Sequence, residues 1–257
     1  MNIQKRKIID INVSALDYSS ALCEISYWID KGIKEYVCVS AVHLLMECQK
    51  DLKLREGVNK AGMVTTDGMP LVWVMKYLWG FKKIERIYGP DLMLKLCKLS
   101  LKKNYKVFLL GGSKGESSLV AEELKRKFKN LKIVGNIDTP IRPIPNIENS
   151  KIISILNSKK PDIVFVGLGC PLQEKWMIEN RKKLNINVLI GVGAAFDFIS
   201  GKSRQANKVL QRLGLEWLYR LMHDPKRLWY RYTVYNFQFV VLLIKDIFKL
   251  GFLKKDN

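Results

Sequence analysis

The pair Asp67-Gly68 has the residue types expected of an acid–base site. It directly follows the apolar run Met63–Thr66, which predicts a strand. A carboxylate at the end of a strand, beside a glycine, is well placed to take a proton from an incoming group. An aspartate here could also cap the helix that begins near Pro70, and for a lone Asp-Gly pair this is the commoner role. Asp67 is therefore a candidate general base. The residues that follow the other predicted strands help to distinguish this role from that of a helix cap.

Glycines follow three other predicted strands, where a phosphate group could bind. Without a side chain the backbone can approach a phosphate closely, and the N-terminus of the next helix attracts an anion. The spacing matches neither the P-loop nor the dinucleotide-binding fingerprint, and tight turns use the same residues. Because several such turns coincide with strand ends, we expect one shared pocket. The glycines are Gly111, Gly112, Gly167, Gly169, Gly191 and Gly193.

Polar side chains accompany these turns. Gln173 and Glu174 follow one glycine turn, and Asp197 follows the next. An amide or a carboxylate at such a place can hydrogen-bond a ligand, although each could instead be a surface residue or a helix cap. Arg86 and Arg204 are candidates to hold phosphate oxygens, and either could be an ordinary surface or ion-pair arginine.

Short apolar runs alternate with helical patterns over the first 200 residues. Runs rich in Val and Ile, most of them followed by a helix, predict an α/β fold with a Rossmann-like, mostly parallel sheet flanked by helices. Ligands bind such a sheet beyond the carboxyl ends of its strands, which is where the candidate residues stand. The predicted strands are Ile8–Val13, Tyr36–Ser40, Met63–Thr66, Lys106–Leu110, Lys132–Ile137, Asp162–Leu168 and Asn187–Val192. The predicted helices cover about residues 17–30, 43–60, 69–79, 90–103, 115–129, 148–158 and 172–184.

The strands end near residue 203, and a basic helical segment follows. We divide the chain into an α/β core, residues 1–202, and a helical appendage, residues 203–257, with helices expected over Leu213–Met222 and Pro225–Leu250. Charges interrupt the last helix too often for a membrane span, which needs roughly 20 apolar residues. A basic, aromatic-rich helix is typical of a segment that lies on a membrane surface. Packing against the protein itself or against another subunit would leave a similar pattern.

Three arginines of the appendage could grip a phosphate. Arg220, Arg227 and Arg231 recur at spacings of seven and four, which place them on one helical face if the break near Pro225 does not rotate it. A guanidinium group can donate two hydrogen bonds to the oxygens of one phosphate. Arginines on a helix more commonly form an ordinary solvent-exposed face. Trp229 and the aromatic residues around it favour a site at the water–lipid boundary.

Composition narrows the function classes. The 257 residues carry a formal net charge of +20, which attracts nucleic acid, anionic lipid head groups or phosphorylated substrates. Five cysteines without C-x-x-C spacing and only two histidines argue against a disulfide framework, a zinc site or a His-rich metal centre. The first apolar stretch is broken at Asp10, too early for a signal peptide. We therefore expect the chain to stay in the cytosol.

Seven stretches of the chain resemble the bacterial WecG/TagA/CpsF glycosyltransferases. Their order and spacing fit from about residue 36 to residue 235. Each motif is weak alone, but seven in order are highly specific. They are Val37–His43, Asp67–Val72, Arg86–Asp91, Phe108–Gly112, Gly167–Glu174, Gly191–Asp197 and Gly214–Arg220.

The resemblance implies an inverting transferase that needs neither a metal nor another cofactor. Members move a sugar, often N-acetylmannosamine or its uronic acid, from a UDP-sugar to an acceptor sugar on undecaprenyl diphosphate. They work at the inner leaflet of the cell membrane and build teichoic acid, common antigen or capsule. The sequence lacks the D-x-D pair with which many sugar transferases hold a cation. The departing diphosphate must then be stabilised by backbone N–H groups, helix dipoles and cationic side chains.

The resemblance also assigns residues. The family's aspartate base falls on Asp67, its active-site arginine on Arg86 and its pocket glutamine on Gln173. The arginines of its membrane-binding appendage fall on Arg220, Arg227 and Arg231.

The chain departs from the family pattern in three places. Ser40 stands where the family often has an asparagine, so a pocket amide is replaced by a hydroxyl. Leu172 replaces a lysine, and Asn207 replaces a proline after the Asp197 turn. These changes predict a difference in donor specificity or a catalytically impaired relative.

Two further function classes stay open. A nicotinamide-dependent oxidoreductase could use a similar sheet, but the missing fingerprint and the basic tail count against it. A nucleic-acid-binding protein would fit the charge, but no nucleic-acid motif is present and the aromatic residues gather in an apolar helix. We therefore expect a UDP-sugar donor, a lipid-linked acceptor and no nucleic acid. The appendage could also pack between subunits of a homo-oligomer.

Overall fold

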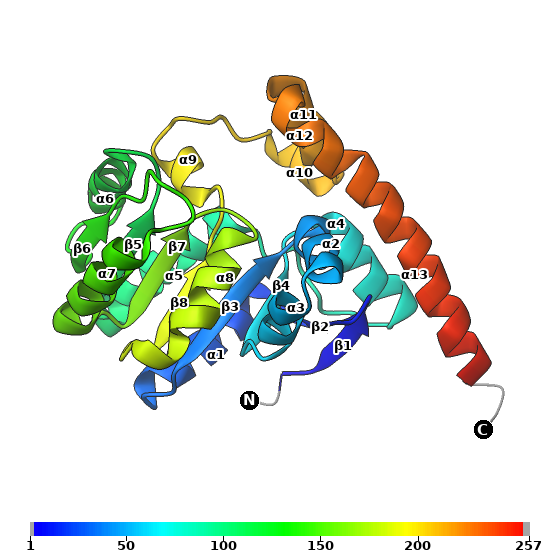
Figure 1. Cartoon of the computed structure of the whole chain (residues 1–257), viewed down its shortest axis with the longest axis horizontal. Coiled ribbons are helices and arrows are strands. Elements are labelled where there is room, and N and C mark those ends of the chain that lie inside the picture. Colours follow the sequence, from blue (N-terminus) through cyan, green and yellow to red (C-terminus); the bar gives the residue numbers. More distant parts are fainter. Residues whose placement is uncertain (1–2, 254–257) are drawn as a thin grey trace.

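A six-stranded parallel sheet forms the centre of the computed structural model (Figure 1). The structure describes residues 3–253. The strands lie in the order β4-β3-β8-β7-β5-β6, and each neighbouring pair is parallel. This confirms the predicted α/β fold. The strands are β3 (Glu35–Ser40), β4 (Met63–Thr66), β5 (Val107–Gly111), β6 (Ile133–Ile137), β7 (Ile163–Gly167) and β8 (Val188–Gly191).

Helices cover both faces of the sheet, as crossovers between parallel strands require. Helices α2, α3, α7 and α8 pack on one face, and α1, α5, α6 and α9 pack on the other. Strands β5, β7 and β8 are buried along their whole length, which is why they read as continuous apolar runs. The helices of the core are α1 (Tyr18–Asp30), α2 (Val42–Lys50), α3 (Leu52–Asn59), α4 (Met69–Trp73), η1 (Val74–Leu78), α5 (Gly89–Lys103), α6 (Glu116–Lys127), α7 (Asn146–Lys159), α8 (Leu172–Asn180), η2 (Arg181–Lys183) and α9 (Ala195–Ile199).

The single strand predicted over Ile8–Val13 is wrong. Two strands, β1 (Lys5–Ile8) and β2 (Ile11–Ser14), form an antiparallel hairpin apart from the main sheet. The chain reverses at Ile9 and Asp10, whose φ angles are 45° and 65°. The apolar run concealed the turn, because its isoleucines are buried on both sides of the reversal.

Several predicted helices are divided. The helix expected over residues 43–60 breaks at Asp51, whose side chain accepts a 3.0 Å hydrogen bond from the Leu54 amide and so caps α3. The helix expected over 69–79 starts as α4 and continues as η1, a π-helix. The helix expected over 172–184 is α8 followed by η2, a 3₁₀ turn.

The C-terminal appendage is helical, as predicted. The helix expected over Pro225–Leu250 is divided at Thr233, and a short helix precedes the first predicted one. Among the described residues no helix is both long and apolar enough to cross a membrane. The appendage consists of α10 (Lys208–Arg212), α11 (Glu216–His223), α12 (Pro225–Tyr232) and α13 (Val234–Leu253).

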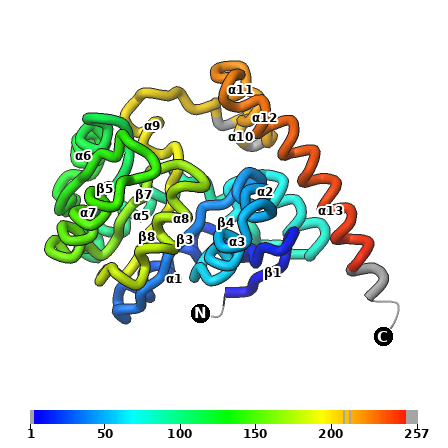
Figure 2. Tube along the Cα trace, in the orientation of Figure 1, coloured from blue at the N-terminus to red at the C-terminus, as the bar shows by residue number. Residues whose placement is uncertain are grey.

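The appendage is anchored to the core at two places along α13, which runs beside α2 (Figure 2). The Tyr235 hydroxyl donates to the Glu47 carboxylate and accepts a 2.7 Å hydrogen bond from Lys50 Nζ. Farther along, Asp246 accepts a 3.1 Å hydrogen bond from the Ile9 amide at the hairpin turn. The connection between α9 and α10 arches over from the core. The division of the chain near residue 202 stays a prediction.

Candidate functional site

The carboxyl ends of the strands open into a cavity of about 420 Å³. The core contributes glycine turns and polar side chains, and the appendage closes the cavity with arginines. Residues that the chain separates by more than 150 positions therefore face one another. The predicted site residues that line this larger cavity are Asp67, Gly112, Gly167, Gly169, Gln173, Gly193, Asp197, Arg220, Arg227 and Arg231.

A smaller cavity of about 90 Å³ adjoins the larger one. Trp217 and Tyr232 line it, with their ring centroids 6.0 Å apart. Met69 and Asn236 contribute to the same wall. Asp67 lines both cavities, so its carboxylate stands where groups bound in the two cavities would meet.

Asp67 is held at this junction by its own backbone. It follows β4, and its amide donates a 2.7 Å hydrogen bond to the Ser40 carbonyl at the end of β3. Arg86 Nε donates to the Asp67 carbonyl from the other side. The side chain is 26% exposed. The carboxylate is thus positioned at the wall of both cavities, and its buried Oδ1 atom has no hydrogen bond from the described residues.

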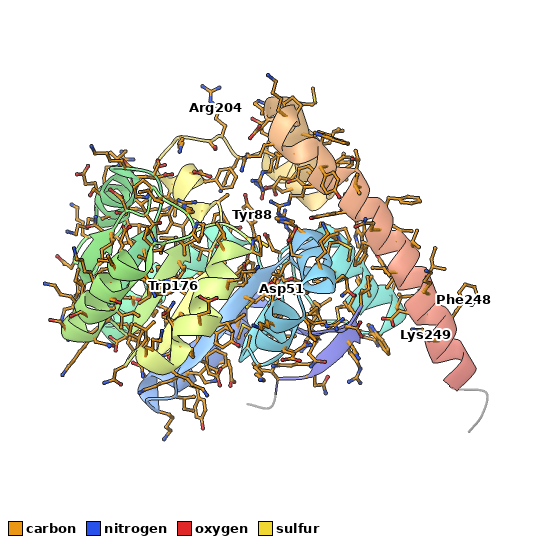
Figure 3. The ribbon with its side chains drawn as sticks, viewed as in Figure 1. Asp51, Tyr88, Trp176, Arg204, Phe248 and Lys249 are labelled. Carbon is orange, nitrogen blue, oxygen red and sulfur yellow. The ribbon has the colours of Figure 1, made fainter. Side chains whose placement is uncertain are left out.

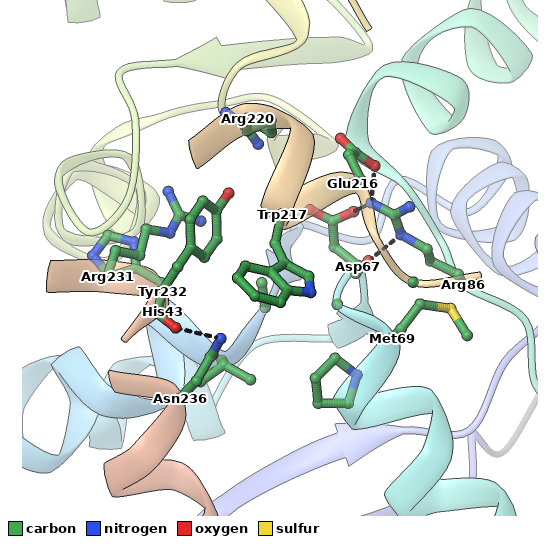
Figure 4. Close-up of a pocket in the computed structure, with 15 residues that line it drawn as sticks. His43, Asp67, Met69, Arg86, Glu216, Trp217, Arg220, Arg231, Tyr232 and Asn236 are labelled. Carbon is green, nitrogen blue, oxygen red and sulfur yellow. Dashed lines mark hydrogen bonds and ion pairs between the residues drawn. The ribbon is translucent and has the colours of Figure 1, made fainter. Parts of the chain in front are cut away.

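Arg86 lies between two carboxylates, as Figure 4 shows. Its Nη2 atom is 2.7 Å from Glu216 Oε2 and 3.5 Å from Asp67 Oδ1. Its guanidinium carbon is 4.5 Å from the ring centroid of Tyr88. Glu216 is therefore the closer ion-pair partner of Arg86, and Asp67 is the more distant one.

The surroundings of Asp67 favour a proton acceptor near neutral pH. Burial raises the pKa of the Asp67 carboxyl to about 6, the Arg86 charge opposes this rise, and the Glu216 charge adds to it. A carboxylate with a pKa close to the working pH combines a large ionised fraction with a useful affinity for protons. The site can therefore perform general-base chemistry on a hydroxyl group.

Gln173 fixes a glycine turn at the floor of the larger cavity. Its Oε1 atom accepts a 2.9 Å hydrogen bond from the Gly193 amide. Its Nε2 atom donates a 2.7 Å hydrogen bond to Glu174 Oε1. Glu174 is fully buried, and burial raises the pKa of its carboxyl to about 7. Glu174 thus contacts Gln173 rather than the cavity.

The predicted glycines fall into two groups. Gly112, Gly167, Gly169 and Gly193 line the larger cavity, whereas Gly111 and Gly191 do not. A Cβ atom on Gly111 would lie 2.5 Å from the Gly167 carbonyl oxygen, and its φ angle is 135°. A Cβ atom on Gly191 would lie 2.9 Å from the Gln173 amide nitrogen. These two glycines allow close packing behind the cavity wall.

The appendage arginines converge despite the break between α11 and α12. Arg220 and Arg231 line both cavities, and Arg227 lines the larger one. Arg227 also pairs with Asp224 at 2.5 Å on the exposed surface. A diphosphate in the larger cavity would meet all three guanidinium groups.

Besides Gly111, Gly191 and Glu174, three more predicted residues line neither of the two cavities. Ser40 is buried, and its hydroxyl is 3.5 Å from the Ala41 carbonyl. Arg204 lies on the connection before α10, and Figure 3 shows its side chain pointing away from the core. Trp229 is 54% exposed on α12. Their roles stay predictions.

Lys202 reaches toward an acidic pair at the edge of the larger cavity. Its Nζ atom is 4.0 Å from Asp197 and 3.6 Å from Glu116. Burial and the Glu116 charge raise the pKa of the Asp197 carboxyl. Among the described residues no group of three or more His, Cys, Asp or Glu side chains is arranged to hold a metal ion.

The sequence did not single out four residues of this site. Glu216 and Trp217 lie inside the matched stretch Gly214–Arg220, which was the available signal. Trp217 and Tyr232 were also noted, but only as two of several aromatic residues in the appendage. Arg142 donates to the Leu168 carbonyl at 3.0 Å and lines the larger cavity, but its proline-rich loop gave no indication of this.

Together the fold and the site define an α/β protein with a candidate acid–base residue and clustered arginines in one cleft. A profile described as "Glycosyl transferase WecG/TagA/CpsF family" matches residues 6–251. The chain belongs to this family.

Named relatives have one activity in common. A protein of Bacillus subtilis (strain 168) is 29% identical over 201 residues, covering 78% of this chain and 76% of the relative. A protein of Staphylococcus aureus (strain MRSA252) is 29% identical over 178 residues, covering 67% of this chain and 66% of the relative. Both are named N-acetylglucosaminyldiphosphoundecaprenol N-acetyl-beta-D-mannosaminyltransferase.

Proposed function

We propose that this protein transfers a sugar, of the N-acetylmannosamine type or another hexose, from a UDP-sugar to an acceptor sugar on undecaprenyl diphosphate, with inversion at the anomeric carbon. The observation that carries the proposal is the position of Asp67 at the junction of the two cavities. Family membership and the names of the relatives support the reaction class and the acceptor. The product serves cell-surface polysaccharide or teichoic acid synthesis.

The larger cavity takes the donor. Its glycine turns supply backbone N–H groups, and Arg142, Arg220 and Arg227 supply positive charge. Such groups stabilise the negative charge that develops on a departing diphosphate. The reaction then requires no cation between the protein and the leaving group.

The smaller cavity takes the acceptor sugar. The rings of Trp217 and Tyr232 offer apolar surface to a sugar face, and Asn236 offers a side-chain amide. An acceptor hydroxyl in this cavity lies next to Asp67.

In the reaction Asp67 takes the proton from that hydroxyl. The oxygen forms a bond to the anomeric carbon on the face opposite UDP, and the bond from that carbon to the diphosphate oxygen breaks. UDP leaves with the electron pair. One attack from the opposite face gives the inverted product.

The acceptor lipid requires contact with a membrane, and the outward face of α13 is suited to this. Phe237, Val241, Ile244 and Phe248 recur along one face and are exposed, while Tyr235 and Phe239 pack inward. Such a helix has apolar residues on both sides, which is unusual in water. The net charge of +20 favours an anionic lipid surface.

An element of the core extends this apolar surface. Trp73, Tyr77 and Leu78 of α4 and η1 are between 44% and 71% exposed. The Trp73 ring lies 3.2 Å from the position of a Cβ atom on Gly214, at the start of α11. We therefore include α4 and η1 in the membrane-binding surface, with the protein peripheral to the cytoplasmic face of the membrane.

The test is UDP release with a panel of UDP-sugars and a soluble lipid-diphosphate acceptor analogue. We expect release that depends on both substrates, and NMR of the product should show the inverted anomer. UDP release at the same rate with and without the acceptor would overturn the proposal. A product with the anomeric configuration of the donor would also overturn it.

A further inference from the structure

We propose that Glu216, supplied by the appendage, holds the Arg86 guanidinium group back from the Asp67 carboxylate and so keeps that carboxylate available as a base. This inference rests on the proposed role of Asp67. It makes Glu216 a positioning residue, because it acts through Arg86 and not on a substrate.

The distances from Arg86 to the two carboxylates show that Glu216 is its closer partner. Arg86 Nη2 lies 0.8 Å closer to Glu216 than to Asp67, at 2.7 Å against 3.5 Å. The shorter contact is a close ion pair between buried groups, and the longer one is an ion pair beyond ordinary hydrogen-bond length. Arg86 therefore makes its closer carboxylate contact with Glu216 and not with the candidate base.

Glu216 is itself firmly held. Its other oxygen, Oε1, accepts a 2.9 Å hydrogen bond from the Tyr88 hydroxyl. The Tyr88 ring also lies 4.5 Å from the Arg86 guanidinium carbon. Glu216 is 5% exposed, so its charge is weakly screened by solvent. The appendage thus places a fixed negative charge where it competes for Arg86.

Removing that charge would change the partner of Arg86. With Glu216 neutral, Asp67 becomes the nearest carboxylate to the guanidinium group of Arg86, whose side chain is 18% exposed. A cation at ion-pair distance lowers the pKa of a carboxyl by about 1–3 units and makes it a weaker base. The charged or titratable groups that face Asp67 are Arg86, Glu216, Tyr88, Arg220, Arg231, His43 and Tyr18.

The consequence is that the base is complete only when the appendage is docked. Asp67 and Arg86 come from the core, and Glu216 begins α11. A core without its appendage would retain both members of the ion pair and lose the residue that separates them. Docking of the appendage and proton acceptance by Asp67 are then coupled through the carboxylate of Glu216.

The decisive measurement is the pH dependence of kcat/KM for the acceptor in the Glu216→Gln variant of the full chain. We expect the acid limb of the profile to move down by about one unit or more and the rate at pH 8 to fall about tenfold. Affinity for UDP should stay within about twofold of the unchanged protein, since Glu216 lines only the smaller cavity.

Two variants separate charge from structure. Glu216→Asp keeps the charge but shortens its reach, so its acid limb should lie between those of the unchanged protein and Glu216→Gln. It also provides the test if Glu216→Gln does not fold. Glu122→Gln makes the same chemical change at an exposed position of α6 and should leave the pH profile unchanged.

The outcomes also distinguish this inference from the proposed function. An unmoved acid limb in Glu216→Gln, with activity lowered or not, would overturn the positioning role and leave Asp67 as the base. Normal turnover of Asp67→Asn would instead overturn the proposed mechanism, and this inference with it.

Discussion

The Tyr88 hydroxyl of the core donates a 2.9 Å hydrogen bond to Glu216 of the appendage, in a place where both side chains are buried. Figure 3 shows Tyr88 between the two parts of the chain. The contact joins residues 128 positions apart. The appendage is therefore part of the wall of the site and not only a tail beside it.

Replacing Asp67 by asparagine tests the proposed base. General-base assistance typically contributes about 10²–10⁴-fold, so Asp67→Asn should lower kcat by that order. Affinity for UDP, measured by calorimetry, should survive, because the diphosphate contacts lie elsewhere in the larger cavity. Asp30→Asn changes an aspartate at the end of α1 that lines neither cavity and should keep full activity. Turnover of Asp67→Asn close to that of this control would exclude Asp67 as the base.

The rate should depend on pH through the same residue. Asp67 must be ionised to accept a proton, and its pKa is raised to about 6 by burial. Activity should therefore rise with pH through about 6 and level off above 7. The measurement is kcat/KM for the acceptor from pH 4.5 to 8.5, in a range where a stability control shows the protein folded. An acid limb centred near the ordinary aspartate pKa, about 3.9, would contradict the burial argument.

Glu174 should make the protein less stable at high pH. Burial raises the pKa of its carboxyl from 4.5 to about 7. The folded state thus holds a proton that the unfolded state has released between these values, and stability falls as pH rises through this window. Glu174→Gln keeps a hydrogen-bond acceptor for Gln173 without an ionisable group. At pH 8 its free energy of unfolding should exceed that of the unchanged protein by about 3 kcal/mol.

Urea denaturation at pH 5 and pH 8 measures this difference. The unchanged protein should lose more stability between the two pH values than Glu174→Gln does. Equal losses would mean that Glu174 is ionised in the folded protein at both pH values.

The outward face of α13 should bind anionic vesicles. Phe237 is 71% exposed and Ile244 is 48% exposed, and burying each in the lipid interface is worth about 1.5–3 kcal/mol. The double change Phe237→Ser and Ile244→Ser should weaken vesicle binding at least about tenfold. Activity on a soluble acceptor analogue should persist.

The matched control changes two exposed apolar residues of the core, Leu119→Ser and Ile155→Ser. Co-sedimentation with phosphatidylglycerol vesicles compares the two proteins. Equal binding by both would exclude α13 as the membrane contact.

Sequence patterns identified the sheet because four of its six strands, β4, β5, β7 and β8, are buried along their whole length. Ile163–Gly167 and Val188–Gly191 are uninterrupted apolar runs, and a run that needs no polar face can be recognised without knowing its neighbours. The same property concealed the hairpin turn at Ile9, where a continuous apolar run contains a reversal of the chain. Thr233 likewise divides a helical pattern that shows no local signal of a break.

The sequence by itself determined the α/β class, the helical appendage and the identity of Asp67, Arg86 and Gln173 as candidate residues, because residue type and strand ends are local information. Tertiary structure alone decided that Arg86 lies closer to Glu216 than to Asp67, and that Glu174 contacts Gln173 instead of the cavity. Burial and side-chain distance arise only when segments far apart in the chain pack together. These two quantities set the charge and the proton affinity of a carboxylate, so the chemistry of the site depends on them.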